Sequence, residues 1–233
     1  RRCGDYYGYF DGESLRGILP IYNLGSCIPH FEDPDAVPFF TELMRKREFE
    51  VLMGMRRIIE PLYRGIKDCK EVQSVDQSSY FINRSFRPFK LDGIDFINAD
   101  KEADGETIDF VLESRIKGFN QHASREDVEE SFAEKGKEEE YIIARRGSKM
   151  VSAACVQTYT QSINQIGSVY TAESERGKGC CKAVVSEMCG RIIAGGKTPT
   201  LMVRKNNTPA VRAYTALGLE NSEPLSARIR GIK

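Results

Sequence analysis

The sequence predicts an α+β fold of the α/β sandwich-like type, in which a mixed, mostly antiparallel sheet is flanked by helices. Two observations predict this class. Short alternating apolar runs near the N-terminus are typical of antiparallel strands, and apolar residues at helical spacing follow from Asp35. After Gly93, strand-like and helix-like segments succeed one another in the order β-α-α-β-β-β-α-β-α-β. We expect two lobes, residues 1–90 and residues 91–233.

The composition is that of an ordinary globular chain. Of 233 residues, 40% are apolar and 29% are charged, and 34 basic residues balance 34 acidic ones. A net charge of zero gives no electrostatic reason to expect nucleic acid or an anionic membrane as a partner. The apolar runs are too short to cross a bilayer. The opening RRCGDYYGYFDG shows no apolar signal segment, and because it lacks an initiating Met we expect a fragment or a processed chain. The cytoplasmic location that we expect rests on the cysteines.

The seven cysteines predict reduced thiols rather than a disulfide framework. Their number is odd, no CxxC or His/Cys metal spacing occurs, and several lie in apolar periodic segments, where Cys acts as a small hydrophobe. His30 and His122 have no ligand-type residue at metal spacing, so we expect both on the surface or in loops. No metal site is predicted.

The first lobe is predicted to begin as a small antiparallel meander over residues 6–29, punctuated by DG and LGS. A helix through Phe39–Lys46, a short strand EVLMGM and a second helix RRIIEPLYRGI follow. Residues 68–90 are polar and irregular, and we expect them to link the lobes. The alternative is that they form the last hairpin of the first lobe.

The second lobe is predicted to begin with the strand IDFINA and two helices. The first helix opens with acidic residues, and the second has Ser124 three residues before Asp127, which is a capping arrangement. The charge run Glu134–Glu140 is expected to be a solvated helix end and turn. The remaining segments are, in order, the strands EYIIARRG, KMVSAACVQTY and NQIGSVYTA, the helix from RGKG to Ala194, the strand TPTLMVRKN, the helix TPAVRAYTAL and the strand SARIRGI.

The segment SVYTAESERGKGCCK carries an apolar strand through two glycines into a helix. Gly177 and Gly179 have no Cβ, so their backbone can take a positive φ and approach a ligand closely. The N-terminus of the following helix offers unpaired N–H groups and a partial positive charge, to which Arg176 and Lys178 add full charges. Such a site suits a pyrophosphate. Taken alone, an ordinary strand-to-helix turn would look the same, and the spacing matches neither a Walker loop nor a dinucleotide fingerprint.

A second segment, RKNNTPAVRAYTALGL, follows about 30 residues later. Asn207 can cap a helix that begins at the next Thr-Pro, and Gly218 can end this helix in the left-handed conformation. These roles give the segment a purely structural account, in which Tyr214 is a core residue. That account and a functional one are equally compatible with the segment alone.

Together the two segments resemble the GCN5-related N-acetyltransferases (GNATs). Arg176-Gly-Lys-Gly179-Cys-Cys181 resembles that superfamily's Q/R-x-x-G-x-G/A loop, and Asn207-x-x-Ala210-x-x-x-Tyr214-x-x-Leu217-Gly218-Leu219 resembles its N-x-x-A-x-x-x-Y-x-x-L-G-F segment. The resemblance implies an acyl-CoA N-acyltransferase fold, with a GNAT acetyltransferase domain over residues 91–233. Residues 1–90 would be a partial or degenerate GNAT-like lobe, as in tandem acetyltransferases. Cys181 departs from the family's Gly or Ala, and Leu219 departs from its Phe.

The resemblance also implies that an acetyl group passes from acetyl-CoA directly to a primary amine of a small-molecule or peptide acceptor. Tyr214 would donate a proton toward the departing CoA sulfur, for which a phenol of pKa about 10 is suited. The pantetheine would pair with backbone at Val169 and Tyr170, and Asn207 would lie near it. The pyrophosphate would take N–H groups from Arg176, Gly177, Lys178, Gly179, Cys180 and Cys181.

The sequence leaves the general base open. Deprotonating a lysine-like amine at pH 7 costs about 4–5 kcal/mol, so a carboxylate should help. Glu113, Glu173 and Glu175 are candidates, and each is equally compatible with a surface charge. A covalent route through Cys180 or Cys181, whose pKa a helix N-terminus would lower, is disfavoured because no His or Asn partner lies nearby in sequence.

Two other functions stay open. A non-catalytic CoA or acyl-CoA sensor would keep the loop and lose the acceptor chemistry, and turnover of any amine would exclude it. A structural protein with a decayed loop would bind no CoA at all. The sequence identifies neither the acceptor nor the oligomeric state.

Overall fold

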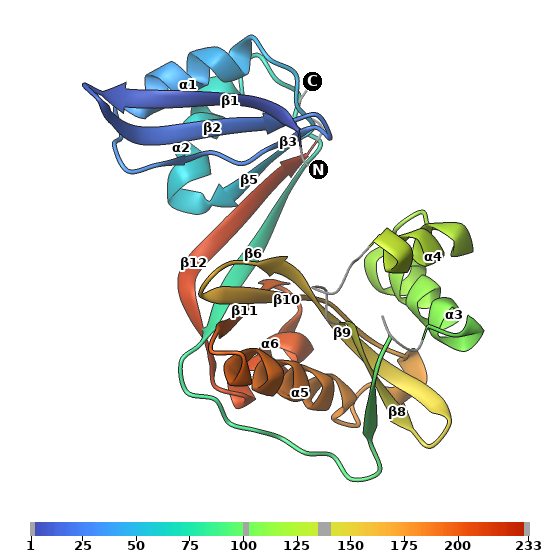
Figure 1. Cartoon of the computed structure of the whole chain (residues 1–233). Helices are drawn as coiled ribbons and strands as arrows, with labels where there is room; N and C mark the ends of the chain where they lie inside the picture. Colours follow the sequence, from blue (N-terminus) through green and yellow to red (C-terminus); the bar gives the residue numbers. More distant parts are fainter. Residues whose placement is uncertain (1–2, 100–102, 135–140, 231–233) are drawn as a thin grey trace. The chain divides into compact units, whose positions relative to one another are not determined.

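The computed structural model describes residues 3–99, 103–134 and 141–230, and it confirms the α+β class. The chain forms two compact units, Arg1–Tyr80 with Glu223–Lys233, and Phe81–Ser222. The strands β6 (Ser74–Asn83) and β12 (Leu219–Arg230) each run through both units (Figure 1). The lobe boundary at residues 90 and 91 stays a sequence-based prediction.

The first unit packs two helices against short strands, as predicted. Its elements are β1 (Gly4–Asp11), β2 (Ser14–Tyr22), β3 (Ser26–Cys27), β4 (His30–Phe31), α1 (Ala36–Arg45), β5 (Val51–Met55) and α2 (Arg56–Ile66). The meander is antiparallel between β1, β2 and β4, whereas β3 pairs with β5 in parallel. The apolar stripes of both helices fill the core with fully buried side chains, among them Phe40, Met44, Ile59 and Leu62.

The second unit has the strand order β6-β11-β10-β9-β8-β7. Antiparallel pairs join β7 (Asp95–Asn98), β8 (Tyr141–Arg146), β9 (Lys149–Tyr159) and β10 (Ile163–Thr171), whereas β10 and β11 (Thr198–Arg204) are parallel. The helices α5 (Cys180–Ala194) and α6 (Thr208–Ala216) cover one face of these strands. The helices α3 (Gly105–Glu113) and α4 (Arg125–Glu134) cover the other (Figure 1).

Strand β8 shows why this sheet separates two cores. Ile142 and Ala144 pack with α5, whereas Tyr141 and Ile143 pack with α3 and α4. Side chains alternate between the faces of a strand, so a strand covered on both faces is a continuous apolar run rather than an alternating one. The run YIIA in the sequence is therefore one strand that serves both cores.

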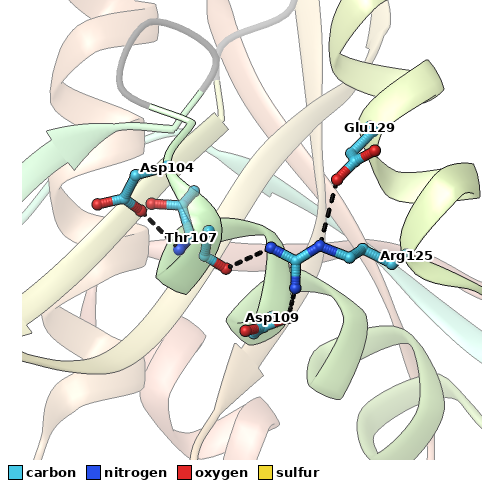
Figure 2. Close-up of polar contacts among 6 residues, drawn as sticks. Asp104, Thr107, Asp109, Arg125 and Glu129 are labelled. Atoms are coloured by element: carbon cyan, nitrogen blue, oxygen red, sulfur yellow. Dashed lines mark hydrogen bonds and ion pairs between the residues drawn. The ribbon is translucent and has the colours of Figure 1, made fainter.

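Arg125 ties α4 to α3. Its guanidinium forms an ion pair with Asp109 on α3 and donates a hydrogen bond to Glu129 on its own helix at 3.2 Å (Figure 2). Asp104 caps α3, since its carboxylate accepts from the N–H of Thr107 at 2.8 Å. The acidic start predicted for this helix thus satisfies one of its free N–H groups.

The cap predicted at the start of α4 is confirmed as a reciprocal pair. The N–H of Asp127 donates to the hydroxyl of Ser124 at 3.2 Å, and the N–H of Ser124 donates to the carboxylate of Asp127 at 2.7 Å. The first helix of this unit differs from the prediction, because its last turn, Ser114–Gly118, is a π-helix. The rest of the charge run after Glu134 lies outside the described residues.

Two predictions were wrong in extent, one of a linker and one of a strand. Residues 68–90 are not a linker throughout, because residues 74–83 form β6. Only its last residues alternate in burial, with Phe81 and Asn83 inside, so its polar first half hid the strand pattern. The final strand begins at Leu219 rather than Ser226, and the polar run with Pro224 concealed its start. Residues 231–232 of the predicted strand lie outside the described residues.

Candidate active site

Two neighbouring parallel strands separate within the second unit. The last pair between β10 and β11 is Ile166 opposite Leu201, although β10 continues to Thr171 and β11 continues to Arg204. Within the described residues, the backbone of residues 167–171 therefore has no partner strand on the β11 side. Backbone N–H and C=O groups need hydrogen-bond partners, so this segment can pair with an extended ligand.

A β-bulge lies in β10 where the strands separate. Gly167 stands opposite Cys155 on β9, and Tyr170 stands opposite Ala153, so two residues of β10 face one residue of β9. Ser168, inside the bulge, has a φ of 48°, which is unusual for a residue other than glycine. Bulges bend their strand and are frequent beside active sites. Here the bulge coincides with the end of the pairing to β11.

The two predicted pantetheine contacts occupy this segment. Val169 is half-buried against the α5 face. Tyr170 is buried on the α3 face, where its hydroxyl donates to Glu113 at 2.8 Å and its ring lies 5.7 Å from that of Phe110. Burial and the Glu113 carboxylate raise the pKa of Tyr170 to about 12. A Cβ at Gly118 would lie 2.7 Å from this ring, so the π-helical turn passes close to the bulge.

The predicted glycine loop leads into the N-terminus of α5. Gly177 and Gly179 have φ values of 76° and 85°, the left-handed conformation that glycine adopts freely. The helix begins at Cys180, and the N–H of Ala183 is bonded to the oxygen of Gly179 at 3.0 Å. The N–H groups of residues 180–182 therefore have no acceptor within the helix and are free for an anion.

Arg176 and Lys178, the charged residues of the loop, are exposed. One of the backbone N–H groups predicted to bind the pyrophosphate already has a partner. The N–H of Arg176 donates to the oxygen of Glu173 at 3.3 Å, so it is already engaged in the short 3-10 turn before the loop. Its guanidinium donates to the oxygen of Thr171 at 3.3 Å. Lys178 lies 3.4 Å from the carboxylate of Glu175.

Glu175 is not the surface charge that the sequence allowed. It is 6% exposed, and its carboxylate lies within 4 Å of Lys149, Lys178 and Arg146. The hydrogen bond from Lys149 and the nearby charges lower its pKa, so it is a poor proton acceptor near neutral pH. Glu173, two residues earlier, is exposed.

Tyr214 is buried, with 5% exposure, and it hydrogen bonds to the thiol of Cys181. Burial raises the pKa of Tyr214 well above its usual range and that of Cys181 to about 11. The pKa that a helix N-terminus was expected to lower is therefore raised at Cys181, because desolvation is the larger effect. Cys180 is buried too, and Arg146 donates to its sulfur at 3.8 Å.

Asn207 and Gly218 perform the structural roles predicted for them. The side chain of Asn207 accepts from the N–H of Ala210 at 3.3 Å and caps α6. Gly218 has a φ of 82°, and a Cβ there would lie 1.7 Å from the oxygen of Ser85. These findings bear out the structural account of the segment, and they leave a ligand role for the exposed Asn207 as a prediction.

A surface depression of about 480 Å³ lies beside the bulged strand. It is lined by Phe110, Glu113, Lys117, Lys149, Met150, Ala172, Glu173 and Ser174. Glu113 accepts from Tyr170 and also lies 3.4 Å from Lys117. Sequence reasoning missed Arg146 and Lys149, because they come from the β8–β9 hairpin, far from the loop in the chain, and no motif marks them.

The described residues contain no helix long and apolar enough to cross a membrane. A cluster of three or more His, Cys, Asp or Glu side chains placed to hold a metal ion is also missing from the described ranges.

Comparison with known proteins places this geometry in a fold family. Residues 143–226, which include the bulge, the loop and α6, match the family model described as FR47-like protein. A search of the curated proteins gave no match. Solved structures give many matches to GNAT acetyltransferases.

Three examples show how much of the chain these structures cover. A GNAT-family acetyltransferase from Colwellia psychrerythraea is 16% identical, with a TM-score of 0.65, over 98% of this chain and 85% of that one. A putative acetyltransferase of the GNAT family from Novosphingobium aromaticivorans is 17% identical, with a TM-score of 0.60, over 92% of this chain and 88% of that one. A tandem GNAT protein from the clavulanic acid biosynthesis pathway is 11% identical, with a TM-score of 0.61, over 98% of this chain and 83% of that one. The resemblance seen in the sequence is confirmed: the chain has the acyl-CoA N-acyltransferase fold of the GNAT acetyltransferases, with an FR47-like, GNAT-related segment at residues 143–226.

Proposed function

We propose that this protein is an N-acetyltransferase that moves an acetyl group from acetyl-CoA to a primary amine of a small-molecule or peptide acceptor. One observation carries the proposal: residues 167–171 of β10, which pair with β9 but, within the described residues, have no partner strand on the β11 side, lead to the glycine loop at the N-terminus of α5. An extended backbone partner and an anion site thus follow each other along one path. Acetyl-CoA has the matching order of groups, because its extended pantetheine arm is joined to a pyrophosphate.

The residues of this path fit acetyl-CoA by their chemistry. Val169 and Tyr170 would present backbone groups to the pantetheine amides, and the N–H groups of residues 180–182 would bind the pyrophosphate. The exposed cations Arg176 and Lys178 add charge-assisted bonds, each worth about 1.5–3 kcal/mol. Glycine at position 177 lets the backbone approach the phosphates, since open space surrounds the place where a Cβ would be.

Tyr214 is proposed to protonate the sulfur that leaves when the amine nitrogen bonds to the acetyl carbon. When bound, acetyl-CoA supplies the activated thioester. Its carbon–sulfur bond breaks, the amine loses one proton and the sulfur gains one. Because the pKa of Tyr214 is raised, its phenol stays protonated through neutral pH and can act as donor. To do so it must exchange its hydrogen bond to Cys181 for one to the leaving sulfur.

Among the three carboxylates considered as general base, Glu113 suits the role best. Glu175 is held by three cations, and its lowered pKa makes it a weak base. Glu113 lines the depression beside the bulge and is 37% exposed, so an amine or a bridging water can reach it. Its hydrogen bond from Tyr170 fixes its position.

A CoA or acyl-CoA sensor of the same fold is the alternative, and one observation favours it. The hydroxyl of Tyr214 already has a partner, the thiol of Cys181, at the position where the family has Gly or Ala. If this bond persists with CoA bound, the chain binds CoA without turnover. Release of free CoA thiol with a panel of amines, including an aminoglycoside, a polyamine and a lysine peptide, separates the two functions.

The first unit fits the proposal of a degenerate GNAT-like lobe. Its order of strand, helix, strand and helix echoes the later part of the second unit, but β5 ends at Met55 and α2 begins at Arg56, with no loop between them. We propose that only the second unit binds acetyl-CoA, and that the protein acts in the reducing cytoplasm.

The experiment that tests acetyl-CoA binding is thermal unfolding of the wild type and of Gly177→Glu. A ligand at about 100 times its Kd adds about 2.7 kcal/mol to the stability of its target. For a chain of this size that is a rise in Tm of about 5–11 °C. Glutamate at position 177 would place a negative charge on the pyrophosphate site, so this variant is expected to lose the rise.

Gly196→Glu is the matched control. Gly196 follows the other end of α5, has a φ of 73° against 76° at Gly177, and has the same open space around it. Both variants therefore carry the same backbone strain and charge, and only Gly177→Glu is expected to lose the shift. If acetyl-CoA leaves the wild-type Tm unchanged, the proposed function is wrong.

A further inference from the structure

Three basic side chains converge on one buried carboxylate next to the glycine loop. The side chain of Glu175 is 7% exposed. One of its oxygens lies 3.0 Å from Lys149, and the other lies 3.4 Å from Lys178 and 3.8 Å from Arg146. This second oxygen makes no hydrogen bond within the described part of the chain. The three cations are between 40% and 55% exposed, so their charged ends remain open to solvent.

This cluster carries more positive charge than its carboxylate needs. One Glu175 among three cations leaves a local excess of two positive charges, in a chain whose net charge is zero. Two acidic side chains, Glu113 and Glu173, line the nearby depression, and within the described residues neither takes part in the cluster's ion pairs: Glu113 pairs with Lys117, and Glu173 is exposed. Charges held close together in partly desolvated surroundings attract an anion more strongly than isolated surface charges do.

The cations come from two elements that a ligand in the loop would lie beside. Lys178 belongs to the loop, whereas Arg146 and Lys149 flank the turn of the β8–β9 hairpin. Lys149 is fixed from both sides, since it also donates to the hydroxyl of Ser174 at 3.1 Å. Glu175 thus acts as an anchor that holds three long side chains in place, which reduces the entropy that they would lose on binding.

We infer that this cluster, Arg146, Lys149 and Lys178 around Glu175, binds the 3′-phosphate of the CoA ribose and so selects CoA over its 3′-dephospho form. The inference rests on the proposed function, in which the N–H groups of residues 180–182 take the pyrophosphate. A second phosphate on the same ligand needs cations beyond those of the loop, and Arg146 and Lys149 supply them beside the loop residue Lys178. A phosphate monoester carries close to two negative charges at pH 7, which matches the excess charge of the cluster.

Calorimetric titration with acetyl-CoA and with 3′-dephospho-acetyl-CoA tests this inference. The wild type is expected to bind acetyl-CoA about tenfold more tightly than the dephospho form, which corresponds to about 1.4 kcal/mol. Lys149→Gln should reduce this preference to about threefold, and Arg146→Gln combined with Lys149→Gln should remove it. Affinity for the dephospho form should stay within about twofold, and the preference should weaken as salt rises.

The ratio of two Kd values measured on one preparation does not depend on the folded fraction, so a loss of stability in these variants does not mimic the result. Lys46→Gln, which breaks an exposed ion pair with Glu42 in the first unit, is the matched control and should keep the preference. Equal binding of both ligands by the wild type would overturn the inference and leave the proposed function standing. Equal weakening of both ligands by Lys149→Gln would also overturn it. If neither ligand binds, the proposed function fails together with the inference.

Discussion

Each compact unit carries a strand into a helix, and the two junctions differ in what they leave open. In the first unit β5 ends at Met55 and α2 follows at the next residue. In the second unit β10 ends at Thr171 and α5 begins at Cys180, with the glycine loop between them. The proposed anion site therefore lies at the junction that has a loop before its helix, and the junction without a loop offers no equivalent segment.

The charges at the two helix starts are also used differently. Arg56 begins α2, but it donates to Glu60 at 2.8 Å, and Arg64 donates to the same carboxylate at 2.7 Å. These arginines are neutralised on their own helix. In the second unit Arg176 and Lys178 are exposed in the loop, and the carboxylate of Glu175 has three cations around it. The excess positive charge is thus at the junction that has the loop.

The largest effect is expected from removing a glycine that the second unit needs for close packing. Gly218→Ala would put a Cβ 1.7 Å from the backbone oxygen of Ser85 and would also force alanine into the left-handed region. We expect a loss of about 3–5 kcal/mol in the free energy of unfolding. Urea unfolding followed by circular dichroism measures it.

Gly12→Ala, in the first unit, is the control for that loss. Gly12 is also left-handed, with a φ of 57°, but nothing lies within 4 Å of the place where its Cβ would be. Its cost should be only the backbone strain, about 1–2 kcal/mol. Equal losses in the two variants would mean that the contact with Ser85 contributes nothing beyond strain.

Charge reversal at the two junctions should separate them by ligand affinity. Arg176→Glu is expected to weaken acetyl-CoA binding by about 1.5–3 kcal/mol, because it replaces a charge-assisted bond with repulsion. Arg56→Glu makes the same change at the start of α2 and should leave the affinity unchanged. Calorimetric titration of both variants measures the difference. A similar loss from Arg56→Glu would show that the first unit also takes part in binding.

The loss of folding stability at acid pH should also differ between the units, by a smaller amount. The pKa of Glu175 is lowered in the folded state, so its contribution is present above the unfolded pKa of about 4.3 and is lost as pH falls through the folded pKa. Glu175→Gln should remove the part of the stability loss at acid pH that comes from Glu175. Glu60, whose pKa is lowered by two arginines on its own helix, should give a weaker effect when changed to Gln, because those arginines are largely exposed and solvent screens the ion pairs. Thermal unfolding from pH 3 to pH 7 tests both.

Much of the fold was predictable because its signals are local. Helix α2, the capping box of Ser124 and Asp127, and the left-handed glycines of the loop all follow from residues near one another in the chain. The misses are non-local. Strand β6 is polar over its first half, so neighbouring strands rather than its own pattern define it. The cations of the hairpin, Arg146 and Lys149, lie near the loop only in the folded chain, and no spacing in the sequence links them to Glu175.

The backbone positions of the site were more predictable than the pKa values of its side chains. The loop and the strand that precedes it occupy the positions that the motif indicated. The pKa values could not be read from the motif, since they depend on burial. A helix N-terminus was expected to lower the pKa of Cys180 or Cys181, whereas the folded chain buries the Cys181 thiol beside Tyr214 and raises its pKa to about 11.

Cys181→Ala is the subtlest test, and it addresses the one residue at which the loop departs from the family pattern. Loss of the thiol removes the hydrogen bond and the nearby charge that help to raise the pKa of Tyr214. That pKa should therefore fall, while burial keeps it above its ordinary value of about 10. The alkaline limb of turnover should move to lower pH, and turnover should rise a few-fold because the hydroxyl no longer has a competing partner. Unfolding free energy should change by no more than about 1–2 kcal/mol.

Cys27→Ala is the matched control, because Cys27 is a buried thiol of the first unit whose pKa burial raises to about 12. It should cost similar stability and leave the pH profile unmoved. If Cys181→Ala leaves the alkaline limb in place, Tyr214 is not the group that protonates the leaving sulfur. In that case the proposed difference between the two units would be one of CoA binding rather than of catalysis, which is what a sensor requires.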